Sequence, residues 1–323
     1  MGGDLPAAGK HYVALCFFLL SLLCVLCVSA LYFLLFGTCQ WTAGPFGKYQ
    51  SQVCCRRNFQ ITQDPKNPML FLRHIGRILF AIGIAAFGAQ YLLHGHYLGG
   101  LPPVPPWAPG GAIGADLVGV FLIVAAVGIT AEWNTCLFAT LIGALFLFCV
   151  IFLHLQHLTD VIHKGNDRTR ALEPLALAAA AFVLAGTFSI SSAKSSTWHT
   201  ALGITSKLAR FVFAFTLIIF GWQHFEYAAY LATLVPGWLP AHLAWIYFTG
   251  AGFIAAGASI ALKILGRISA SILGLMFFLW VVTLHAPRVY ASLHNADEWS
   301  SLFVALAMAG SSFLLASTLP NRP

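Results

Sequence analysis

The chain has 323 residues, of which 59% are hydrophobic and 8% are charged, and its formal net charge is +7. A soluble domain carries about 25% charged residues, so this composition excludes a soluble globular protein. A membrane β-barrel needs alternating polar and apolar positions, but Ala14–Phe36 and Phe211–Phe220 are apolar on nearly all sides. We therefore predict an all-α integral membrane protein.

About nine apolar segments are long enough to cross a bilayer, whose core of about 30 Å requires roughly 20 apolar residues per helix. In chain order, the predicted spans lie near Val13–Phe36, Ile75–Leu98, Ala115–Thr130, Thr135–Leu158, Leu172–Ile190, Phe211–Leu231, Leu243–Leu262, Ile268–Leu284 and Leu302–Leu319. The first segment is longer than the apolar core of a signal peptide, which is roughly 7–15 residues, so we interpret residues 1–37 as a membrane helix. A hydrophilic loop, residues 38–72, follows it.

The rest of the chain repeats itself. At an offset of 133 residues, Arg77, Phe80, Gln90 and Tyr97 fall on Arg210, Phe213, Gln223 and Tyr230. After the proline-rich loop the offset is 131, and Gly143, His154, His163 and Asp167 fall on Gly274, His285, His294 and Glu298. We call residues 73–193 the first repeat and residues 203–320 the second repeat. Each is predicted to be a four-helix bundle; an even number of helices makes the two parallel, with any shared site near their interface.

The basic residues predict an orientation. If the loop of residues 38–72 is cytoplasmic, 12 of the 17 Lys and Arg residues lie on the inner side. The positive-inside rule then places the N-terminus outside and the C-terminus in the cytoplasm. These cations lie at loop ends and form no nucleic-acid-binding patch, so the lipid bilayer is the expected partner and nucleic acid is not.

Three motifs of the second repeat resemble the DoxX-like family of four-helix bacterial membrane proteins. They are Phe220–Phe225 (FGWQHF), Leu234–Pro240 (LVPGWLP) and Tyr247–Gly250 (YFTG), together with Arg210. The resemblance covers about residues 205–319 and, through the internal repeat, residues 72–193. It implies a left-handed four-helix bundle in the bacterial inner (plasma) membrane, with links to sulfur oxidation, terminal quinol oxidation and oxidative-stress complexes.

A polar stripe on one predicted helix suggests a site. Gln223, Glu226, Tyr227 and Tyr230 share one helix face because of their i, i+3, i+4, i+7 spacing. An acidic side chain within a span is costly and usually faces a partner or a pathway. We interpret Glu226, Gln223 and Tyr230 as the catalytic group of a quinone-headgroup or proton site, with cofactor contacts from Gln90, Tyr97, Tyr227 and His224. The alternative is interhelical hydrogen bonding with no further function.

A second candidate site consists of histidines near the outer ends of the helices, which are His154, His157, His163, His285 and His294. Two imidazoles at i, i+3, as in His154 and His157, can bind one metal ion, and nearby carboxylates would complete or orient the site. The alternative is that these histidines bond lipid headgroups. Quinone, haem and a metal ion therefore all remain candidate cofactors.

Taken together, these patterns predict a membrane subunit of redox metabolism that binds quinone or a small electron donor beside a redox protein complex. The alternative is a protein without enzymatic activity, either a transporter of small solutes or lipids or an assembly or structural subunit of a membrane complex. No phosphate-binding loop or nucleophile-elbow motif is present. Whether the protein is an enzyme is left open at this point.

Overall fold

The computed structural model describes residues 68–189 and 197–320, and within these ranges the chain is helical with no strand. Eight helices there are long and apolar enough to cross a membrane: Pro68–His94, Gly111–Thr130, Thr135–His163, Gly165–Phe188, Thr200–Glu226, His242–Leu262, Gly266–Ala291 and Ala296–Thr318. The prediction of an all-α membrane protein is confirmed. The predicted span Val13–Phe36 lies outside the described residues.

Each repeat contains four long helices and several short ones. The first repeat comprises α3 (Pro68–His94), α4 (Gly111–Thr130), α5 (Thr135–Cys149), the π-helical turn η1 (Val150–His154), the 3-10 turn η2 (Leu155–His157), α6 (Leu158–His163) and α7 (Gly165–Ser189). The second comprises α8 (Thr197–Glu226), α9 (Ala228–Ala232), α10 (His242–Leu262), α11 (Gly266–Trp280), the π-helical turn η3 (Val281–His285), α12 (Ala286–Ala291) and α13 (Ala296–Thr318).

The elements of the two repeats correspond in their details. Helices α5 and α11 both have 15 residues, and each continues into a five-residue π-helical turn that ends at His154 or His285. Positive φ angles of Glu132 (57°) and Lys263 (60°) also occur at matching positions, which lie between α4 and α5 and between α10 and α11. A non-glycine residue seldom adopts such an angle. The two connections between helices therefore have the same unusual backbone conformation in both repeats.

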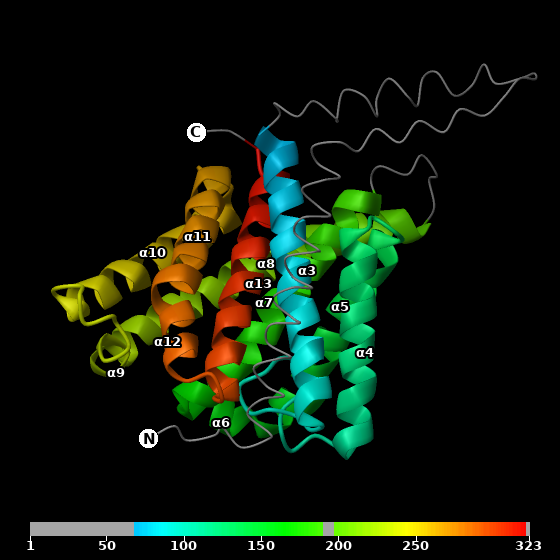
Figure 1. The fold of residues 1–323 in the computed structure, drawn as a ribbon. Coiled ribbons are helices and arrows are strands. Elements are labelled where there is room, and N and C mark those ends of the chain that lie inside the picture. Colours follow the sequence, from blue (N-terminus) through cyan, green and yellow to red (C-terminus); the bar gives the residue numbers. More distant parts are fainter. Residues whose placement is uncertain (1–67, 190–196, 321–323) are drawn as a thin grey trace, which may run out of the picture. The chain divides into compact units, whose positions relative to one another are not determined.

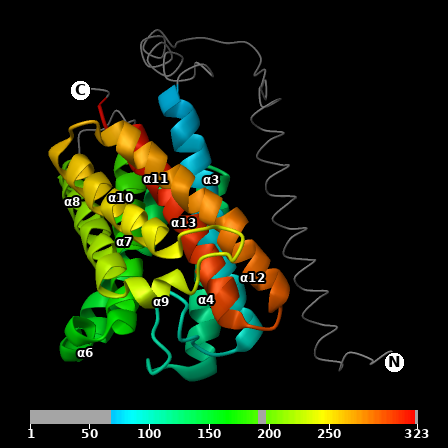
Figure 2. The same ribbon diagram turned by 90° about the vertical axis from the view of Figure 1, so that its left-hand side faces the viewer.

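The helices of the two repeats pack against each other as well as within each repeat (Figures 1 and 2). Helix α7 of the first repeat contacts α5, α8 and α13, and α13 of the second repeat contacts α11. Helix α3 lies against α13 so closely that a side chain at Gly76 would overlap the backbone nitrogen of Leu314. The spans of α7 and α13 are accordingly the most buried, at 72% and 67%.

The outer helices present apolar side chains outward. On α4, Leu117, Val120, Val124 and Val127 are all about half exposed or more, and their spacing places them on one helix face. A soluble protein would not expose such a continuous apolar surface, so this face is built to contact lipid. The helices run between two ends of the molecule. We call the end where α7 and α13 begin the α7 end, and the opposite end, where α3 and α8 begin, the α8 end.

Candidate functional site

A cleft of about 790 Å³ lies at the α7 end, between α7 of the first repeat and helices α8, α9, α10, α11 and α13 of the second. Its lining extends along α13 from Asp297 to Met308, a distance of about 16 Å at 1.5 Å per residue. That length is roughly half the thickness of a bilayer core. The cleft thus reaches from one end of the spans toward the middle of the membrane.

Apolar and aromatic side chains form most of the wall, and they include Phe220, Phe253, Phe277, Trp280, Val304 and Met308. The ring of His224 is 5.1 Å from the ring of Phe253 and is stacked on Trp280 at 6.4 Å. Stacked and edge-to-face rings of this kind form flat, rigid surfaces. The wall therefore suits a planar ring with an apolar attachment.

The polar part of the wall contains Arg170, Glu173, Gln223, His224, His285 and Asp297. The amide nitrogen of Gln223 donates hydrogen bonds to the carbonyl oxygen of Gly165 and to Oγ1 of Thr169, both at 3.0 Å. Because a carbonyl oxygen can only accept, this bond fixes the orientation of the amide. The oxygen Oε1 of Gln223 is buried and has no hydrogen-bond partner among the described residues.

The two cleft histidines add further unpaired atoms. Nδ1 of His224 lies 2.7 Å from the carbonyl oxygen of Phe220 and must be the donor in that bond, so Nε2 of the neutral ring is an acceptor. Nδ1 of His285 is buried and has no partner in the described part of the chain. The cleft thus contains two defined acceptors, Oε1 of Gln223 and Nε2 of His224, and one further unpaired ring nitrogen, Nδ1 of His285.

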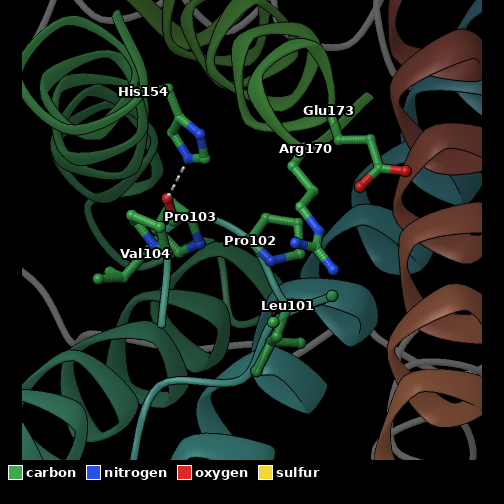
Figure 3. A pocket seen from close by; sticks show the side chains of 10 residues that line it. Leu101, Pro102, Pro103, Val104, His154, Arg170 and Glu173 are labelled. Atoms are coloured by element: carbon green, nitrogen blue, oxygen red, sulfur yellow. Dashed lines mark hydrogen bonds between the residues drawn. The ribbon is translucent and has the colours of Figure 1, made fainter. Parts of the chain in front are cut away.

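Glu173 lies between the cleft and a smaller pocket of about 20 Å³ (Figure 3). The smaller pocket is lined by Gly99–Pro105, His154, Arg170 and Glu173, and its volume suffices for about one water molecule. Arg170, one turn earlier on α7, lines both cavities and acts electrostatically on Glu173. Within the described ranges no hydrogen bond to the Glu173 carboxyl group occurs, so it is open to a ligand.

Among the described residues of the first repeat, side chains fill the space that corresponds to the cleft. Tyr91, which corresponds to His224, is fully buried, and its hydroxyl group donates to the carbonyl oxygen of Leu101 at 3.0 Å and accepts from the nitrogen of Val104 at 3.2 Å. These bonds draw the loop inward, and Leu101 and Val104 are buried. His224 is shorter and bonds its own helix, so the corresponding loop of the second repeat is not held in this way.

Several predicted site residues line this cleft, namely Gln223, His224, Tyr227, Tyr230 and His285. Glu226 does not line it: its carboxylate lies 2.5 Å from Nη2 of Arg168, and its side chain is 35% exposed. Gln90 is buried beside Ser300, whose hydroxyl group donates to it at 3.3 Å. Tyr97 packs edge-to-face on Tyr91, and burial raises the pKa of its hydroxyl group.

Two of the predicted metal ligands, His154 and His157, have contacts within the fold. Nε2 of His154 donates to the carbonyl oxygen of Pro103 at 3.4 Å, which supports the closed loop (Figure 3). His157 packs edge-to-face on Trp107, and His163 and His294 are exposed. In residues 68–189 and 197–320 no three His, Cys, Asp or Glu side chains come together as a metal site would require.

Glu173 and Arg170 were not among the sequence-based candidates. The available signal was the acidic residue itself, since Glu173 falls inside the predicted span Leu172–Ile190. An ionisable residue within a span is a reason to expect a function. Its position directly before Pro174 and near the predicted span boundary makes it resemble a loop residue in the sequence alone.

Comparison with known proteins adds nothing to this description: no family model, no curated protein and no solved structure matches the chain.

Proposed function

We propose that the chain is a DoxX-like membrane protein whose cleft in the second repeat binds a quinol, the reduced form of a quinone, in redox metabolism of the bacterial inner membrane. The observation that carries this proposal is a deep aromatic cleft in which Oε1 of Gln223 and Nε2 of His224 are acceptors that no donor of the described residues pairs with. A quinol brings hydroxyl donors on a planar ring, whereas a quinone brings only carbonyl acceptors. A buried acceptor left unpaired costs about 1–3 kcal/mol, so the acceptor set favours the reduced form.

The dimensions of the cleft support the same ligand. Pockets for small molecules typically measure about 300–1,000 Å³ and combine apolar walls with a few polar groups, as the cleft of about 790 Å³ does. The quinol ring would lie against the surface formed by His224, Phe253 and Trp280, with its hydroxyl groups directed to Gln223 and Glu173. Its apolar tail would follow the wall formed by Val304 and Met308.

Each polar residue would have a defined part in handling the quinol. Oε1 of Gln223 accepts one hydroxyl group, and the Glu173 carboxylate accepts the other and takes its proton. Oxidation of a quinol to a quinone releases two protons and two electrons. The electrons require an electron-accepting redox protein, so a redox complex is the proposed partner, and the protons leave through groups such as Glu173.

We also propose the finer architecture, in which residues 73–193 and 203–320 are duplicated four-helix bundles in parallel orientation and the N-terminus is outside. The matching π-helical turns support the duplication. In the described ranges, six Lys and Arg residues but only one carboxylate, Glu132, lie at the α8 end, which supports a cytoplasmic location for that end. The cleft would then face the outer side of the membrane.

Binding to the purified protein tests the proposal. A short-chain quinol and the corresponding quinone would be titrated separately into the detergent-solubilised protein, with quenching of tryptophan fluorescence as the signal because Trp280 lies in the cleft wall. We expect the quinol to bind at least about tenfold more tightly, since one paired acceptor contributes about 1.4 kcal/mol. Equal affinities, or tighter binding of the quinone, would contradict the proposed selection of the reduced form.

A further inference from the structure

The two repeats differ in charge at the α8 end. The cations of the described residues there are Arg73, Arg77, Lys207, Arg210, Lys263 and Arg267, and the single carboxylate is Glu132. All other carboxylates of the described ranges lie at or near the α7 end, seven in number: Asp116, Asp160, Asp167, Glu173, Glu226, Asp297 and Glu298. Charge compensation at the α8 end therefore depends on where Glu132 lies.

In the first repeat Glu132 neutralises its neighbours. Its carboxylate forms an ion pair with Nη1 of Arg77, and Nδ1 of His74 lies 3.9 Å away. His74 and Arg77 are themselves 3.3 Å apart, measured from Nδ1 to Nη2. Glu132 thus lies among basic groups that come from the first turns of α3.

In the second repeat a cation takes the place of this carboxylate. Lys263 has the same positive φ as Glu132, at 60° against 57°. Helices α8 and α10 also meet in the same way as α3 and α4. A side chain at Gly88 of α3 would overlap the carbonyl oxygen of Gly119 of α4, and a side chain at Gly221 of α8 would overlap that of Gly250 of α10. Along this shared frame, Lys207 and Arg210 occupy the positions of His74 and Arg77.

Lys207, Arg210 and Lys263 thus hold the positions of His74, Arg77 and Glu132, and among the described residues no carboxylate replaces Glu132 in this set, which we call the cation set. No ion pair joins any of the three to an acid within the part of the chain that the structure describes. Nε of Arg210 is buried without a hydrogen-bond partner, and its guanidinium lies 4.6 Å from the ring of Phe211. Because a carboxylate pairs with the equivalent basic residues of the first repeat, an anion bound at the corresponding place beside these cations would be stabilised.

We propose that Lys207, Arg210 and Lys263 bind the phosphate group of an anionic phospholipid. The membrane span of α10 ends at Leu262, directly before Lys263, so Lys263 lies at the level of lipid headgroups. Exposed apolar side chains adjoin the three cations, with Leu208 61%, Phe211 48% and Leu262 68% exposed. A free phosphate ion would use only the cations, whereas a phospholipid also covers this apolar surface.

The repeats supply a matched pair of variants for the test. Lys263→Glu recreates the arrangement of the first repeat and should fold, and Glu132→Lys recreates the cation set of the second repeat in the first. Native mass spectrometry of the full chain would measure retained phosphatidylglycerol against phosphatidylcholine. Each basic residue near a membrane surface contributes about 1 kcal/mol to binding anionic lipid, so we expect Lys263→Glu to lower phosphatidylglycerol affinity at least about tenfold.

Glu132→Lys is expected to raise the number of tightly held phosphatidylglycerol molecules by one. A second arm adds inorganic phosphate to the wild-type protein, and phosphatidylglycerol should remain bound at millimolar phosphate. Wild-type retention by Lys263→Glu, retention of phosphatidylcholine equal to that of phosphatidylglycerol, or displacement of the lipid by inorganic phosphate would each overturn the proposal. This site is separate from the cleft, so the outcome does not depend on quinol binding.

Discussion

Replacing Glu173 by Gln is expected to weaken quinol binding by about tenfold to a hundredfold. The substitution keeps the shape of the side chain and removes the carboxyl group that pairs with a ligand hydroxyl group, and leaving that buried hydroxyl group unpaired costs about 1–3 kcal/mol. Glu173 has no hydrogen bond within the described ranges, so no hydrogen bond of the fold is lost. The measurement is the same quinol titration, performed on the wild-type and variant proteins.

Glu226→Gln is the matched control because it applies the same change to the acidic residue of the predicted polar stripe. Its carboxylate is paired with Arg168 and does not line the cleft, so quinol affinity should stay within about twofold of the wild-type value. The reverse ranking, with Glu226→Gln impaired and Glu173→Gln unchanged, would return the site to the residue that the sequence pattern favours and would contradict the assignment of Glu173.

His224→Tyr is expected to close the cleft and to lower quinol affinity by more than about a hundredfold. Tyr91 at the equivalent position fills the interior of the first repeat and holds its loop through Leu101 and Val104. A tyrosine at position 224 is longer than histidine and would extend past the rings of Phe253 and Trp280 into the cleft, where it would exclude the quinol ring. Losing the contacts of a buried aromatic ring costs several kcal/mol, which accounts for the size of the effect.

His224→Asn distinguishes filling of the cleft from loss of the imidazole. Asparagine is smaller than histidine and leaves the space open, so quinol affinity should fall by no more than about tenfold, the contribution of one hydrogen bond. Thermal unfolding of both variants serves as the folding control. If His224→Tyr is folded and binds quinol as the wild-type protein does, the ligand does not occupy this cleft.

Hydropathy predicted much of the fold because a span needs only length and apolar composition. The eight predicted segments after residue 72 correspond to the eight long apolar helices of the described ranges. Helical spacing also placed Gln223, Tyr227 and Tyr230 on one face, and all three line the cleft. The same spacing could not separate Glu226 from the cleft residues, because its ion pair with Arg168 depends on how α7 meets α8.

The cleft itself could not be predicted from the sequence. Tyr91 and His224 are both ordinary residues of an apolar helix, and the repeat alignment shows only that they differ. Whether the interior is filled depends on the path of the following loop, which Tyr91 holds through backbone atoms of Leu101 and Val104. Hydrogen bonds to backbone atoms leave no trace in a pattern of side-chain types, so the open space of the second repeat emerges only in three dimensions.

Site mapping with a photoreactive quinol analogue would show whether quinol binds in the cleft. The membrane-embedded protein would be labelled, digested and analysed by mass spectrometry, with an excess of unlabelled quinol as competitor. We expect competable labelling of cleft segments around Phe253, Trp280 and Met308. Labelling that falls on the first repeat near Tyr91, or that the competitor leaves unchanged, would contradict quinol binding in the cleft.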